Sequence, residues 1–163
     1  MKKRTHFFLS KSLDIPSRYK FWVCFGSISP DLTFMCLVKP HQFKIRINDV
    51  LKLYSSLDFN NKDWLFYYRV GVVSHFVADF FTSPHNRKGV KGFCTMHRGY
   101  ELDLDRFFKV NFKYYKFSSI DDIDFKNYLY SLHKEYMSKD FTLRNDFSYI
   151  CEVVGLIYSK ALI

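Results

Sequence analysis

Apolar side chains recur at intervals of three and four residues along most of this chain, and no stretch alternates convincingly between apolar and polar positions. The first pattern is typical of amphipathic helices, whereas strict alternation would indicate half-buried strands. Proline, glycine and paired asparagine residues separate the periodic stretches. The pattern predicts helices over residues 6–14, 17–25, 47–57, 62–82, 97–116, 122–138 and 143–162. We therefore predict an all-α fold, a single-domain multi-helix bundle over residues 1–163.

Length, composition and charge narrow the class of protein. With 163 residues, the chain is long enough for one well-buried core and too short for two typical domains. Apolar residues make up 48% of it, which indicates a globular protein. The formal net charge of +9 favours anionic partners, namely phosphate esters, lipid headgroups or nucleic acid.

The N-terminal residues and the cysteines bear on the compartment. After a basic start, the only apolar run is Phe7–Leu9, which is too short for the core of a signal peptide. No later stretch approaches the roughly 18 uncharged apolar residues of a membrane span. The four cysteines are scattered and form no Cys-x-x-Cys pair, so we expect reduced, mostly buried thiols. These observations predict a cytoplasmic protein whose contact with a membrane would be peripheral.

Five candidate metal ligands lie within residues 75–101. They are His75, Asp79, His85, His97 and Glu101. The first two and the last two are each four residues apart, which places each pair on one face of a helix. Imidazole and carboxylate groups without cysteine are the ligands of a hydrolytic site for zinc or a similar divalent ion.

A surface ion pair is the alternative explanation for one histidine and one aspartate at this spacing. The stripe of the predicted helix that carries His75 and Asp79 is otherwise apolar or aromatic, with Trp64, Tyr68 and Val72 before them. Burying an imidazole and a carboxylate there costs several kcal/mol unless they are paired or bind a cation. Two such pairs with an intervening histidine therefore favour the metal site.

The spacing H-x3-D-x5-H-x11-H-x3-E resembles the zinc-dependent phospholipase C family, whose relatives include the S1/P1-type nucleases. The resemblance extends upstream to Thr5-His6, to the stretch Gly26-Ser-Ile-Ser-Pro-Asp31 and to His41, and it covers residues 5 to about 105. It implies an all-helical fold with a three-metal cluster that cleaves phosphate esters.

The same resemblance implies a role for each candidate ligand. Asp31, His41, His75 and Asp79 would surround one zinc ion, and His85, His97 and Glu101 would hold a second. Asp79 would also bridge to a third ion shared with His6, and Asp31 corresponds to the proposed general base. In the secreted enzymes the amino group and carbonyl of a processed N-terminal Trp complete the third site, whereas this sequence starts at Met1. We expect two zinc ions and leave the third open.

The sequence thus predicts a metal-dependent phosphoric ester hydrolase resembling phospholipase C, in which a metal-activated water cleaves the ester. The substrate would be an anionic phosphoester such as a phospholipid headgroup. A basic collar of Arg87, Lys88, Lys91 and Arg98 beside the ligands favours an anion. Two alternatives remain: an S1/P1-type nuclease acting on nucleic acid, and a non-catalytic helical protein stabilised by zinc. A metal with an exchangeable water would favour an enzyme, and closed four-ligand shells would favour the structural role.

Overall fold

The computed structural model describes residues 1–32, 40–86, 93–114 and 124–162, and within these it does not describe the side chains of residues 93–97 and 114. Every regular element in this part of the chain is helical, which confirms the predicted all-α fold. In chain order the elements are α1 (Lys3–Lys11), α2 (Ser17–Ile28), η1 (Ser29–Leu32), α4 (Phe43–Ser55), α5 (Trp64–Phe80), α6 (Ser83–Asn86), α7 (Phe93–Asn111), η2 (Phe112–Tyr114), α8 (Phe125–Met137) and α9 (Leu143–Leu162).

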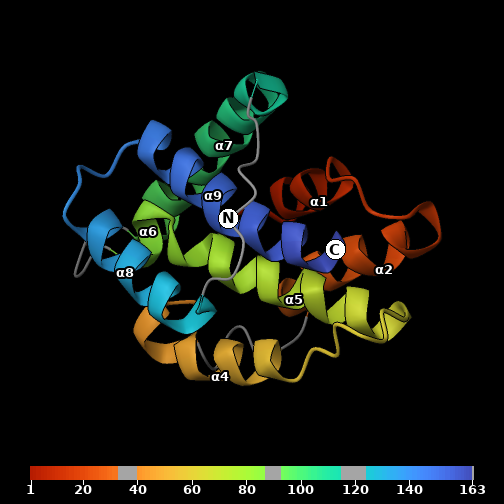
Figure 1. Ribbon diagram of the computed structural model, residues 1–163. Coiled ribbons are helices and arrows are strands. Elements are labelled where there is room, and N and C mark those ends of the chain that lie inside the picture. Colours follow the sequence, from red (N-terminus) through yellow and green to blue (C-terminus); the bar gives the residue numbers. More distant parts are fainter. Residues whose placement is uncertain (33–39, 87–92, 115–123, 163) are drawn as a thin grey trace.

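Helix α5 runs through the middle of the molecule, with α2 packed along it, α4 along one side and α9 along another (Figure 1). Its sequence is apolar around most of its circumference, as expected for a helix covered on several sides. Asp63 begins it as the N-cap, since its carboxylate accepts a hydrogen bond of 2.8 Å from the Phe66 backbone N–H. Its most exposed residue lies in the first turn: Trp64 is 48% exposed, whereas the later residues are buried or only partly exposed.

Two glycines bring the backbones of α2 and α5 into direct contact. A Cβ atom on Gly26 would lie 2.1 Å from the Tyr68 carbonyl oxygen, and one on Gly71 would lie 2.3 Å from the Val23 carbonyl oxygen. No side chain fits at either position, which explains why Gly71 stands inside a helix despite its poor helix propensity. The contact places the C-terminal half of α2 against the second turn of α5.

The predicted helix boundaries differ from the observed ones at several places. The helix predicted over 62–82 ends at Phe80, and residues 83–86 form the separate single turn α6, because the chain turns before Pro84. Helix α1 begins at Lys3 rather than at residue 6, and α4 begins at Phe43 rather than at residue 47. Helix α7 begins at Phe93, four residues earlier than predicted.

Two further observations concern the cysteines and the possibility of membrane-spanning helices. Cys24 and Cys151 are buried free thiols, while Cys36 and the side chain of Cys94 lie outside the description. Across the described ranges, no helix combines the length and the apolar character that crossing a bilayer requires.

Candidate metal centre

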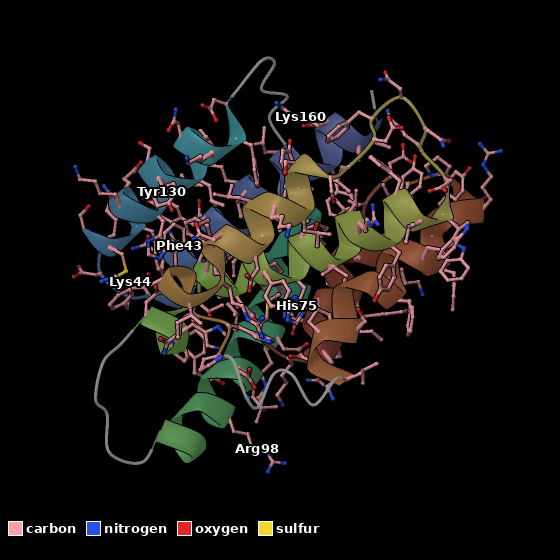
Figure 2. The ribbon with its side chains drawn as sticks, turned by 90° about the horizontal axis from the view of Figure 1, so that it is seen from below. Phe43, Lys44, His75, Arg98, Tyr130 and Lys160 are labelled. Carbon is pink, nitrogen blue, oxygen red and sulfur yellow. The ribbon has the colours of Figure 1, made fainter. Side chains whose placement is uncertain are left out.

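The centre is built around His75 and Asp79, one helical turn apart on α5 and both fully buried. Figure 2 shows His75 inside the fold, where nitrogen atoms of neighbouring side chains gather. His75 Nδ1 lies 2.9 Å from the Ser27 carbonyl oxygen on α2. A carbonyl can only accept, so Nδ1 carries the proton and donates it, and Nε2 keeps a free lone pair. Burial, followed by the neighbouring His6, lowers the pKa of His75 well below its usual value, so the ring is neutral.

Three further candidate ligand atoms lie within 3.6 Å of His75 Nε2. His75 Nε2 lies 3.1 Å from His41 Nδ1, 3.5 Å from Asp79 Oδ2 and 3.6 Å from Asp31 Oδ1. His41 Nδ1 lies 3.0 Å from Asp79 Oδ2 and 3.8 Å from Asp31 Oδ1. Zinc bonds of 2.0–2.1 Å in a tetrahedral shell place ligand atoms about 3.4 Å apart. Asp31, His41 and His75 form a group whose ligand atoms all lie within 4.8 Å of one another, and Asp79 Oδ2 lies close to both of these histidines. These separations are compatible with ligands of a zinc ion.

The second oxygen of Asp79 faces a different group. Asp79 Oδ1 lies 2.7 Å from the amino group of Met1 and 3.2 Å from His6 Nε2. The Met1 amino group also lies 3.3 Å from Glu101 Oε1 on α7. The His6 ring stacks on the His75 ring with 4.0 Å between centroids. Asp79 therefore presents one oxygen to each of two adjacent clusters, which is the geometry of a bridging carboxylate.

Unsatisfied nitrogen atoms support a cation at this place. In the described part of the chain, the buried Nε2 atoms of His6 and His41 have no hydrogen-bond partner. The 3.2 Å approach of His6 Nε2 to Asp79 is a close contact without hydrogen-bond geometry. Leaving a buried polar atom unpaired costs about 1–3 kcal/mol, and a divalent ion between His6 and Asp79 would remove that cost for His6. Imidazoles and carboxylates without thiolates suit zinc.

The ligand set predicted for a second ion is described only in part. His85 lies on the single-turn helix α6 rather than on a loop, and its Nδ1 lies 3.1 Å from the Asp79 carbonyl oxygen and 3.8 Å from Asp79 Oδ2. Glu101 reaches the same region from α7. His97 lies on α7, but its side chain is outside the described residues. His85 and Glu101 thus approach Asp79 from two further helices.

Asp79 and the Met1 ammonium group hold each other in charged form. Burial works to raise the pKa of Asp79, but the Met1 ammonium, His85 and His6 together hold it well below its usual value. Burial likewise works to lower the pKa of the Met1 amino group, yet Asp79 and Glu101 raise it. Burial, followed by the negative charge of Asp79, raises the pKa of Asp31. The Met1 ammonium thus places a positive charge between Asp79 and Glu101.

These groups lie at the base of a cavity of about 660 Å³. Asp31, His41, Asp79, His85 and Glu101 line it, together with Met1–Arg4 and Pro40–Gln42. The basic residues of this wall come from the start of α1. Of the predicted basic collar, Arg87, Lys88 and Lys91 lie outside the described residues, and Arg98 is exposed and points away from the molecule (Figure 2).

Two buried aspartates that the sequence did not single out support the ligand-bearing helices. Asp146 on α9 accepts hydrogen bonds from the Ser83 backbone N–H at 2.8 Å, the Ser83 hydroxyl at 2.7 Å, the Tyr136 hydroxyl at 2.8 Å and the Tyr100 hydroxyl. Ser83 lies two residues before His85, and Tyr100 directly precedes Glu101. Asp146 therefore fixes the positions of α6 and α7 behind the cavity.

Asp105 performs the same task for α1. It accepts a hydrogen bond of 2.9 Å from the Thr5 hydroxyl and a charged one from Arg4, and Lys109 approaches it at 3.2 Å. Arg4 and Thr5 directly precede His6, so this cluster holds α1 against α7. No short sequence motif marks either aspartate, because their partners lie up to 101 residues away.

An all-helical fold that converges histidines and carboxylates on adjacent positions defines a candidate metalloprotein. The family model described as zinc dependent phospholipase C matches residues 5–143, and the chain belongs to this family. No curated protein and no solved structure gives a significant match to the chain. The family supports a metal-dependent phosphoesterase and a lipid phosphoester, and it gives the nucleic-acid alternative no support.

Proposed function

We propose that this protein is a zinc-dependent hydrolase that cleaves the phosphate ester of a lipid headgroup. The observation that carries the proposal is the convergence of Asp31, His41 and His75, whose ligand atoms lie within 4.8 Å of one another, with Asp79 Oδ2 beside both histidines. Membership of the zinc dependent phospholipase C family supplies the reaction class.

Each candidate ligand would bind one of three ions, and Asp79 would bind two of them. Asp31, His41, His75 and Asp79 Oδ2 would hold the first ion. His85, His97 and Glu101 would hold the second, and Asp79 Oδ1 with His6 and the Met1 amino group would hold a third. When bound, the ions lower the pKa of water and neutralise charge on a phosphoryl group. The Ser27 carbonyl keeps His75 in the tautomer that leaves Nε2 available.

Residues of the cavity wall would bind and orient the substrate. Lys2, Lys3 and Arg4 place positive charge beside the carboxylate cluster, where phosphoryl oxygens could accept their hydrogen bonds. Arg4 is already paired with Asp105, so Lys2 and Lys3 are the freer of these charges in that wall. Asp31 lies at the border between the buried cluster and the open cavity, with 19% of its side chain exposed. A carboxylate in that position can accept the proton of an attacking water, which is the general-base role proposed for Asp31.

Metal analysis and a substrate panel test the proposal together. Purified protein reconstituted with zinc should retain at least two equivalents by elemental analysis. It should then hydrolyse a phospholipid or a soluble phosphodiester more readily than single-stranded DNA, and Asp31→Asn should abolish turnover. Fewer than one equivalent of zinc would contradict the metal centre.

The non-catalytic alternative has its own outcome in this experiment. A structural zinc has a closed shell of protein ligands and no exchangeable water. Full zinc content with no hydrolysis of any phosphoester, and no water on the metal by spectroscopy of the cobalt-substituted protein, would refute the hydrolase and leave a zinc-stabilised helical protein.

A further inference from the structure

Exposed phenylalanine side chains cluster on α1 and α2, away from the core. Phe21 is 66% exposed, Phe7 41% and Phe25 40%. The rings of Phe21 and Phe25 are stacked nearly parallel with 5.9 Å between centroids. Between the two helices lies an apolar hollow of about 230 Å³, with Lys11 and Lys20 at its edge. We call this surface the α1–α2 face.

Helix α2 is apolar on more sides than its packing requires. Its inner side, with Val23 and Gly26, contacts α5, and this contact buries it. Phe21, Phe25 and Ile28 then follow one another at helical spacing on the outer side, and Leu32 of η1, 57% exposed, continues the row. A helix with apolar residues all round is normally covered on all sides. The outer row therefore indicates a surface with an apolar partner.

The charge of residues 1–30 indicates which kind of partner the α1–α2 face would bind. Residues 1–30 contain six lysines and arginines and a single acidic residue, Asp14. On α1 the residues Lys3, Phe7 and Lys11 stand four apart, so cations alternate with an aromatic ring along one face. Phenylalanine and leucine beside lysines are typical of helices that lie in the interface of an anionic bilayer. The aliphatic stems of the lysines can reach the headgroups while the rings enter the acyl region.

The α1–α2 face is continuous with the candidate metal cavity. Lys3 belongs to both, since it lines the cavity and begins the row of α1. On the other helix, Leu32 directly follows Asp31, which lines the same cavity. A bilayer in contact with this face would therefore lie beside the opening through which a headgroup must enter. This continuity favours a membrane over a protein partner.

We propose that the α1–α2 face docks the protein on the surface of an anionic phospholipid bilayer. Phe7, Phe21 and Phe25 insert between lipids, and Lys11 contacts anionic headgroups. The choice of a lipid surface rests on the proposed function, but the contact itself needs no hydrolysis. Docking and catalysis can therefore be measured separately.

Vesicle sedimentation tests the contact directly. Wild-type protein should sediment with vesicles of phosphatidylcholine containing phosphatidylserine, more weakly with phosphatidylcholine alone, and less at high salt. The double variant Phe21→Ser/Phe25→Ser should lose about tenfold or more in partitioning, because both rings are exposed and neither belongs to the buried core. Lys11→Glu should lose about tenfold on anionic vesicles only, since each basic residue near such a surface contributes about 1 kcal/mol. Tyr130→Ser on α8, another exposed aromatic position at 42%, is the matched control and should bind like wild type.

Three outcomes would overturn the proposal. They are no sedimentation of the wild type, equal binding by the double variant, and binding of single-stranded DNA through the same phenylalanines. Hydrolysis of a soluble phosphodiester distinguishes a loss of membrane binding from a loss of catalytic activity. The double variant should hydrolyse it normally while losing activity on vesicles. Phenylalanine-dependent vesicle binding without hydrolysis of any substrate would support docking and refute the hydrolase.

Discussion

Asp79 and Asp146 are both almost completely buried, yet their surroundings differ in kind. Asp79 is within 4 Å of four histidines and the Met1 ammonium, and in the described part of the chain the buried Nε2 atoms of His6 and His41 have no hydrogen-bond partner. Asp146 accepts four hydrogen bonds from neutral hydroxyl and amide donors. Burial, the largest influence on both, raises the pKa of Asp146, whereas charged neighbours outweigh it at Asp79 and lower that pKa.

The difference separates a binding carboxylate from a structural one. A carboxylate whose lone pairs are all satisfied by fixed donors has nothing to offer a ligand, but it connects the elements that supply those donors. A carboxylate held among cations and neutral imidazoles has competing partners, one of which can be exchanged for a metal ion. Burial alone would not have distinguished them, whereas the identity of their partners does.

The largest expected effect is that of Asp79→Asn. This change keeps the shape of the side chain and removes the charge facing two clusters, so zinc content should fall and hydrolysis should fall more than about 100-fold. In zinc-free protein the buried Met1 ammonium would lose its closest partner, and the free energy of unfolding should fall by about 3 kcal/mol. Elemental analysis, kinetics and urea unfolding measure these effects. Unchanged zinc content would remove Asp79 from the centre.

Asp146→Ala should act on stability instead. Four donors would lose their acceptor, and the free energy of unfolding should fall by about 3 kcal/mol or more. Asp146→Asn is the matched control and should cost about 1 kcal/mol, because the Tyr136 hydroxyl can rotate to accept from the amide. Both should bind zinc at wild-type stoichiometry when folded. Loss of zinc from stably folded Asp146→Asn would make the two aspartates alike and contradict the comparison.

His6→Ala should have a smaller effect than Asp79→Asn. His6 approaches only one oxygen of Asp79, so one ion at most should be lost, and hydrolysis should fall about tenfold. Zinc stoichiometry and kinetics measured beside Asp79→Asn check this ranking. Equal losses of activity in the two variants would show that Asp79 does not bridge.

The smallest expected effect is on how the stability cost of Asp79→Asn and of Asp146→Asn depends on pH. Urea unfolding of zinc-free protein measures this cost as a change in the free energy of unfolding. The lowered pKa of Asp79 means that its contribution is complete above its unfolded value of about 3.9 and is lost as pH falls through the folded value. The raised pKa of Asp146 means the reverse: its contribution is complete below about 3.9 and is lost as pH rises. The cost of Asp79→Asn should therefore shrink below about pH 4, and that of Asp146→Asn above it. Neither slope should exceed about 1.4 kcal/mol per pH unit, and parallel profiles would contradict the contrast.

The helical fold could be predicted because apolar periodicity is a local property of the chain. The pairing of His75 with Asp79 was equally accessible, since four residues make one turn. The hydrogen bonds that Asp146 accepts could not be predicted from the sequence. They join Asp146 to Ser83, Tyr100 and Tyr136 across 10 to 63 residues and involve common hydroxyl groups. The place of the Met1 amino group beside Asp79, 78 residues away, also depends on how α1 packs.

The backbone contact at Gly26 and Gly71 has a consequence for how this family can diverge. Gly26 precedes Ser27, whose carbonyl orients His75, and Gly71 lies one turn before His75 on α5. The distance between the two helices thus sets whether that carbonyl reaches the imidazole. A related sequence could keep every ligand but have a side chain at the position of either glycine. In such a protein the Ser27 carbonyl should no longer orient the imidazole, and the metal centre should not form. The two glycines would therefore serve as a better marker of an intact site than the ligands alone, and they could be used to separate active from degenerate family members.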